Sequence, residues 1–60
     1  MKPIVEHFTF RNTIWCRTYH PKQDMTFFST KKHIDGPESI QQVFEENVSV
    51  ARFKKLILFS

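Results

Sequence analysis

Apolar and polar residues alternate along the first half of the chain with the two-residue period of β-strands. Residues 3–10, 13–20 and 25–31 follow this period and are rich in β-branched and aromatic residues. Residues 11–12 (Arg-Asn) suit a tight turn, because Asn tolerates a positive φ, and residues 21–24 (Pro-Lys-Gln-Asp) have the composition of a second turn. The pattern predicts three consecutive antiparallel strands. One long strand with a bulge at residues 11–12 is the alternative to the first two.

The residues after the third predicted strand favour a helix. Asp35 can act as its N-cap, Glu38 completes a capping box three residues later, and Pro37 suits the first turn. The residues expected on the inner side of this helix recur at spacings of three and four residues. Its members are Ile40, Val43, Phe44 and Asn47.

Residues 51–59 predict a final strand, because they end in the apolar run Leu-Ile-Leu-Phe. A second helix is the alternative there, since residues 52–58 lack strict alternation. The expected fold class is therefore α+β, a small antiparallel sheet in the order β-β-β-α-β with one helix packed on one face. A length of 60 residues is enough for a single domain, residues 1–60.

The two short turns determine which residues of neighbouring strands are paired. The expected pairs are Phe10–Thr13, Phe8–Trp15, Glu6–Arg17 and Ile4–Tyr19 across the first turn, and Tyr19–Thr26 and Arg17–Phe28 across the second. Aromatic, ionic and aliphatic pairs thus fall opposite each other, and such pairs stabilise a sheet by roughly 0.2–1 kcal/mol each.

This register sorts the strand residues onto two faces of the sheet. The aromatic face carries Ile4, Glu6, Phe8, Phe10, Trp15, Arg17, Tyr19, Thr26 and Phe28. The mixed face carries Val5, His7, Thr9, Ile14, Cys16, Thr18, His20, Met25, Phe27, Ser29 and Lys31. One helix can cover only one face, and we expect it to cover the aromatic face. The reverse arrangement would leave an exposed aromatic patch around a charge pair.

The net charge of +3 is unevenly distributed along the chain. Residues 35–46 hold four acids and no base, a charge of −4, whereas the remainder holds nine bases and two acids, a charge of +7. The predicted helix is therefore acidic and the predicted strands are basic. An acidic helix face at Glu38, Glu45 and Glu46 can mimic a polyanion and bind a basic groove on a target. An ordinary solvated surface is the alternative interpretation.

Few residues are candidates for catalysis or metal binding. Cys16 is the only cysteine, which excludes an internal disulfide and is typical of a reducing compartment. His7 is expected opposite Cys16, but His20 lies four residues further along the strand, roughly 13 Å away, so three ligands do not converge. Glu45 and Glu46 point in different directions on a helix, and no glycine-rich turn supplies an oxyanion hole. We expect no enzyme activity, no metal and no cofactor.

These observations favour a non-enzymatic binding protein, an inhibitor, neutraliser or regulator of a protein partner. The size and layout are also typical of small phage or mobile-element proteins that block a host enzyme, a similarity of scale alone. A homodimer would stabilise so small a core. The residues expected to bind the partner are Trp15, Arg17, Tyr19, Phe27, Phe28, Lys31, Glu38, Glu45 and Glu46.

Binding of single-stranded RNA or DNA is the alternative function. Arg17 lies between Trp15 and Tyr19, and basic side chains interleaved with aromatic rings are typical of single-strand binding. The basic residues of this alternative are Arg17, Lys31, Lys32, Arg52, Lys54 and Lys55. No apolar run approaches the roughly 18 residues of a membrane span, and the N-terminus lacks a signal-peptide core. We therefore expect a cytoplasmic protein with no membrane partner.

Overall fold

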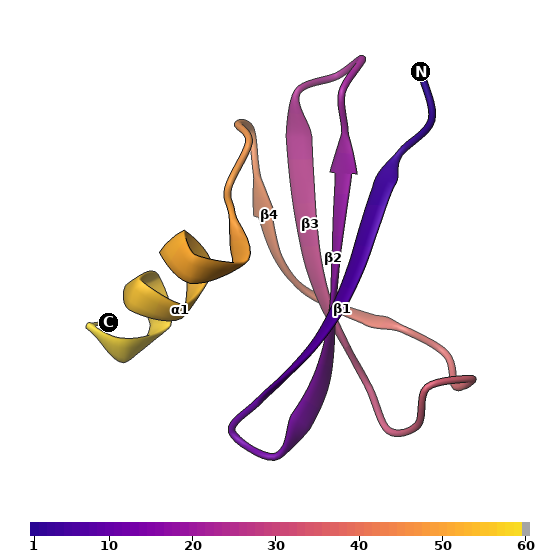
Figure 1. Ribbon diagram of the computed structural model, residues 1–60, viewed down its shortest axis with the longest axis vertical. Helices are drawn as coiled ribbons and strands as arrows, with labels where there is room; N and C mark the ends of the chain where they lie inside the picture. The colour runs from indigo at the N-terminus through magenta and orange to yellow at the C-terminus, as the bar shows by residue number, and fades with distance from the viewer. Residues whose placement is uncertain (60) are drawn as a thin grey trace.

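Three strands follow the alternating pattern of the first half of the chain. They are β1 (Ile4–Phe10), β2 (Thr13–His20) and β3 (Met25–Lys31). The computed structural model describes residues 1–59, and in that part of the chain a fourth strand completes one antiparallel sheet in the order β1-β2-β3-β4 (Figure 1). The prediction of three consecutive strands is confirmed, and the merged long strand is excluded.

The predicted register of these strands is confirmed. Phe8 pairs with Trp15 and Glu6 with Arg17, and every other expected pair across the two turns is also present. Arg11 and Asn12 adopt φ angles of 55° and 58°, both in the left-handed region. Two successive residues with positive φ form the tight turn whose twist matches that of a β-hairpin.

The prediction of a helix after β3 is wrong. Residues Ser39–Phe44 form strand β4, which pairs antiparallel with β3 and contains an irregularity opposite Phe28/Ser29. The strand places Ile40 opposite Ser29 and Val43 opposite Phe27, so both of these side chains join the mixed face. The acidic helix face expected at residues 38–46 is therefore absent from residues 1–59.

The prediction of a final strand is also wrong, and the alternative of a helix is right. Helix α1 spans Val50–Leu58, so the element order is β-β-β-β-α and the fold class remains α+β. Ser49 is its N-cap, with a side chain that accepts a hydrogen bond from the backbone N–H of Arg52 at 3.1 Å. This capping oxygen satisfies one of the amides that a helix N-terminus leaves unpaired.

Two requirements explain why strand and helix exchange places. The outer edge of β3 carries a row of N–H and C=O groups that need partners, and the extended segment 39–44 supplies them. Phe53 and Ile57 are four residues apart and so share one side of helix α1, and this side covers the aromatic face of the sheet. Local capping signals are worth about 1 kcal/mol, and they act only if the helix itself forms.

The hydrophobic core lies between the aromatic face and α1, as expected for that face. Phe28, Val48 and Phe53 are buried, and partly buried side chains pack against them. The rings of Phe28 and Phe53 stack at 3.8 Å between centroids, and Trp15 meets Phe53 edge-on at 5.1 Å. The partly buried members are Phe8, Trp15, Phe44 and Ile57.

Two polar side chains of the aromatic face hold the segment that leads into α1. The guanidinium of Arg17 donates hydrogen bonds to the carbonyl oxygen of Val48 at 2.6 Å, to Asn47 Oδ1 at 2.5 Å and to Glu6 Oε1 at 2.9 Å. Thr26 Oγ1 accepts from the backbone N–H of Val48 at 3.0 Å. These contacts position Val48 in the core and set where the helix begins.

Candidate functional site

The mixed face of the sheet is not covered by α1, which lies on the opposite side (Figure 1). Val5 from β1 is 54% exposed, and Ile40 and Val43 from β4 are 62% and 46% exposed. These β-branched side chains suit a strand. Exposed apolar side chains that gather on one face are typical of a surface that binds a partner. The uncovered mixed face is therefore the candidate binding surface.

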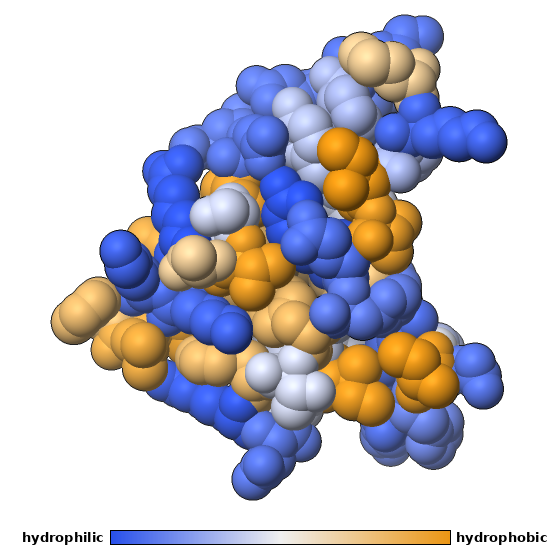
Figure 2. All heavy atoms as spheres, viewed as in Figure 1, coloured by the Kyte–Doolittle hydropathy of each residue, from blue (hydrophilic) through white to orange (hydrophobic). Residues whose placement is uncertain are grey.

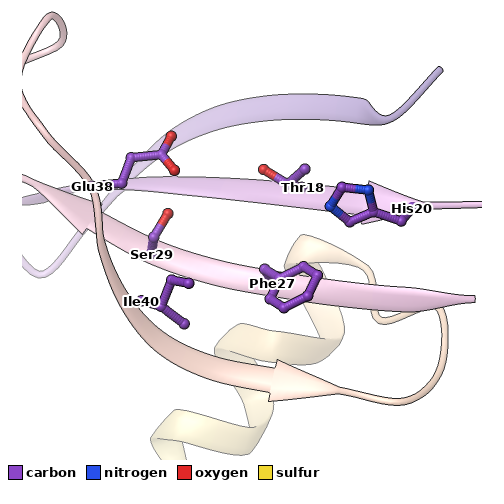
Figure 3. Close-up of a pocket in the computed structure, with 6 residues that line it drawn as sticks. All are labelled: Thr18, His20, Phe27, Ser29, Glu38 and Ile40. Atoms are coloured by element: carbon purple, nitrogen blue, oxygen red, sulfur yellow. The ribbon is translucent and has the colours of Figure 1, made fainter. Parts of the chain in front are cut away.

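A shallow hollow of about 240 Å³ lies on this face (Figure 3). Its labelled side chains rise from the same side of the sheet, with the helix behind. A second hollow of about 220 Å³ adjoins it, because both are lined by His20 and Phe27, whose rings meet edge-on at 5.2 Å. The residues lining the two hollows are Thr18, His20, Gln23, Met25, Phe27, Ser29, Glu38 and Ile40.

Cys16 lies beneath the surface of the mixed face and is completely buried. Burial raises the pKa of its thiol above the ordinary value, and nearby Glu38 acts in the same direction. A hydrogen bond with the Thr18 hydroxyl, 3.8 Å from the sulfur, opposes the shift. The thiol is therefore protonated at neutral pH and is a poor nucleophile.

Charges on the mixed face largely cancel. Lys31 Nζ lies 3.6 Å from a carboxylate oxygen of Glu38 and donates a hydrogen bond to the carbonyl oxygen of Ile34 at 3.2 Å. Figure 2 shows apolar side chains among hydrophilic ones on the side of the sheet away from α1. The surface is thus mostly apolar, with hydroxyl and imidazole groups and little net charge.

Three residues expected at the partner surface lie instead in the interior of the aromatic face. Phe28 is fully buried, Arg17 is 5% exposed, and Trp15 packs against the core with its Nε1 atom buried and unpaired within residues 1–59. The cause is that α1 covers this face. In this structure these three side chains hold the helix on the sheet.

The remaining expected partner residues are scattered. Phe27 lines both hollows, and Lys31 and Glu38 lie at one end of the mixed face. Tyr19, on the aromatic face, donates a hydrogen bond to Asp24 Oδ1 at 2.7 Å, which raises the pKa of the phenol. The other two lie in the loop after β4, where Glu45 is exposed and Glu46 forms an ion pair with Arg52.

The basic residues of the nucleic-acid alternative do not line one track. Arg17 is buried and Lys31 is paired, as described above. Lys54 Nζ lies 5.7 Å from the ring centre of Phe8 and 5.8 Å from that of Phe10. Lys32, after β3, and Lys55, on α1, are exposed and far apart in the fold, and neither forms an ion pair within residues 1–59.

No group of three His, Cys, Asp or Glu side chains that could hold a metal ion occurs in the part of the chain that the structure describes. His7 lies opposite Cys16 in the sheet, as predicted. The thiol beside it is protonated, so this pair lacks the thiolate that nucleophilic catalysis requires.

Sequence reasoning missed the contribution of β4 to the candidate surface. Their spacing of three residues predicts that Ile40 and Val43 lie on the inner side of a helix. Their β-branched side chains, followed by the aromatic Phe44, are the signal that could have indicated a strand.

Comparison of the chain with protein-family models, with curated proteins and with solved structures gives no match. Within residues 1–59, no helix has the length and apolar character needed to cross a bilayer.

Proposed function

We propose that this chain is a small non-enzymatic binding protein, an inhibitor or regulator that docks a protein partner on its mixed sheet face. The observation that carries the proposal is the exposure of Val5, Ile40 and Val43 on the one sheet face that α1 leaves open. Apolar surface that faces a partner loses its contact with water on binding, at about 25 cal/mol per Å².

The composition of the face supports a protein partner over a charged polymer. Its Lys31 and Glu38 are paired with each other, while hydroxyl and imidazole groups from Thr18 and His20 border the hollow. An apolar centre with polar groups at its border is the usual arrangement of a protein interface. The partner surface would therefore present an apolar side chain to the hollow over Phe27.

Binding of single-stranded nucleic acid receives less support. Stacking on bases needs exposed rings next to basic groups. Trp15 and Phe28 are instead packed under α1, and the guanidinium of Arg17 is occupied by three protein acceptors.

The proposal is tested by comparing variants of two equally exposed apolar residues. Ile40→Lys alters the mixed face, whereas Leu58→Lys, of similar exposure, alters α1 on the other side. Proteins captured from the native cell by the wild-type chain are identified, purified and titrated calorimetrically. The expected result is that Ile40→Lys weakens binding at least ~10-fold and Leu58→Lys does not.

Circular dichroism shows whether both variants keep the wild-type fold. A purified partner that binds the wild-type chain and Ile40→Lys equally well would contradict the proposal. Oligonucleotides that quench the chain's fluorescence, with a quenching that decreases steeply as salt is added, would also contradict it. This result would favour the nucleic-acid alternative.

A further inference from the structure

Helix α1 carries apolar side chains on its outer side as well as on its inner side. Phe53 and Ile57 face the core, but Leu56, Leu58 and Phe59 are 45%, 58% and 86% exposed. A helix on the surface of a small protein usually has a polar outer side. Figure 1 shows the C-terminal end of α1 directed away from the sheet, and Figure 2 shows apolar side chains at that end with hydrophilic ones on either side.

The charged side chains of α1 are all positive. Arg52, Lys54 and Lys55 lie on α1, and residues 47–59 contain no acid. Glu46, which precedes the helix, forms an ion pair with Arg52 and neutralises its charge. The charges of Lys54 and Lys55 are then not balanced by an acid of α1. Lys54 lies over the rings of Phe8 and Phe10 in β1, so Lys55 is the lysine of α1 that is free on its outer side.

A hollow next to the helix extends the apolar surface toward β4. Its volume is about 210 Å³, and Leu56 forms one of its walls. The other residues that line it are Gln42, Phe44, Phe53 and Ile57. Of these residues Leu56 is the exposed apolar one, so the hollow lies between the outer side of α1 and the edge of the core.

We propose that the outer side of α1 binds the surface of an anionic lipid bilayer, with Leu58 and Phe59 inserted at the headgroup boundary. An amphipathic helix with apolar residues flanked by lysines is suited to this position, since anionic lipids attract the lysines while the apolar side chains leave water. A second copy of the chain fits less well, because a two-fold contact would bury this positively charged surface against an identical one.

This contact differs from a membrane span and replaces the expectation of no membrane partner, which rested on the absence of a long apolar run. A helix that lies on a bilayer needs no such length. The contact also uses a different surface from the mixed face. Binding of a bilayer by α1 is therefore independent of whether a protein partner binds the mixed face.

The test is co-sedimentation of the full chain with vesicles. Vesicles of phosphatidylcholine and phosphatidylglycerol in equal parts are compared with phosphatidylcholine alone, at low and moderate salt. We expect salt-sensitive binding to the anionic vesicles only. Lys55→Gln is expected to weaken binding ~5-fold, and Leu58→Ser with Phe59→Ser at least ~10-fold.

Two matched controls test whether the effect belongs to α1. Lys32→Gln removes another exposed lysine from the loop after β3, and Ile40→Ser removes an exposed apolar side chain from the mixed face. Both are expected to bind vesicles as the wild type does. Since all substituted side chains are exposed, circular dichroism should be unchanged.

Several results would overturn the proposal. These are no binding to anionic vesicles at low salt, equal binding to neutral vesicles, or an equal loss of binding in Lys32→Gln. If sedimentation velocity instead shows a wild-type dimer that Leu58→Ser with Phe59→Ser makes monomeric, the outer side of α1 is a subunit interface. Loss of partner binding in Ile40→Lys without any change in vesicle binding separates the two proposals.

Discussion

Arg17 Nε donates a hydrogen bond of 2.6 Å to the carbonyl oxygen of Val48, which joins β2 to the segment just before α1 across 31 residues of sequence. The guanidinium is 5% exposed and also binds Asn47 and Glu6. A buried charge is tolerated only when hydrogen bonds and a counter-charge replace its hydration. Arg17 is therefore one of the two side chains of the sheet that set the position of the helix.

Replacing Arg17 with Lys tests this dependence. Lysine keeps the charge but cannot direct three separate donors at Val48, Asn47 and Glu6 in the plane of a guanidinium. We expect the free energy of unfolding in urea to fall by about 2–3 kcal/mol. Arg11→Lys, at the exposed turn between β1 and β2, is the control and should change it by less than about 0.5 kcal/mol. Equal losses in the two variants would show that Arg17 does not hold the helix.

The Thr26 hydroxyl serves two backbone groups of the same segment. It donates to the carbonyl oxygen of Glu46 at 2.6 Å and accepts from the N–H of Val48 at 3.0 Å. Thr26→Val keeps the shape and leaves both groups unpaired, so unfolding free energy should fall by about 2 kcal/mol. Thr9→Val, at an exposed position of β1, should have little effect, and a similar loss there would contradict the assignment.

Helix α1 and the helix predicted from the sequence can be distinguished by their caps. Ser49→Ala removes the side-chain acceptor for the N–H of Arg52 and should lower unfolding free energy by about 1 kcal/mol. Asp35→Ala removes the cap of a helix that does not form and should leave stability nearly unchanged. Urea unfolding of both variants checks this, and the opposite order of losses would favour the predicted helix.

The Tyr19 phenol donates a hydrogen bond to Asp24, which raises the pKa of Tyr19 because the neutral phenol is the form that can donate. Asp24→Asn should therefore lower this pKa, and asparagine tolerates the φ of 53° at that position. Tyr19 is the only tyrosine, so ultraviolet absorbance reports its titration directly. Asp35→Asn is the control and should leave the titration unchanged.

The sign of the accompanying stability change follows from the direction of the Tyr19 pKa shift. Because the folded pKa lies above the unfolded value, the stabilisation is fully present below the unfolded pKa and is lost as pH rises through the folded pKa. The wild type should therefore lose stability relative to Asp24→Asn only in alkaline solution, above the ordinary pKa of tyrosine.

Burial raises the pKa of Cys16, so its thiol should react slowly with a disulfide reagent at neutral pH. An exposed thiol for comparison is provided by Thr9→Cys in a Cys16→Ser background. We expect Cys16 to react much more slowly than this thiol and to reach a similar rate in urea. Equal rates under native conditions would show that Cys16 is accessible.

The first half of this fold follows from the sequence alone. Strands β1 to β3 are joined by short turns, so the alternation of side chains and the turn lengths together determine the register. The pairs Phe8–Trp15 and Glu6–Arg17 and the aromatic face were predicted on this basis. These features depend on residues that lie close together in the chain, because the two-residue period of a strand is the same all along it.

The second half was decided by tertiary structure. Residues 39–44 pair with the free edge of β3, and the Phe53–Ile57 side of α1 covers the aromatic face. Local signals favour the opposite assignment, because a capping box at Asp35 precedes the segment that becomes β4 and three- and four-residue spacings occur within it. The sequence could therefore indicate that one face would be covered and the other left open. Which segment covers it depends on contacts between residues far apart in the chain, and those contacts also place Ile40 and Val43 on the open face.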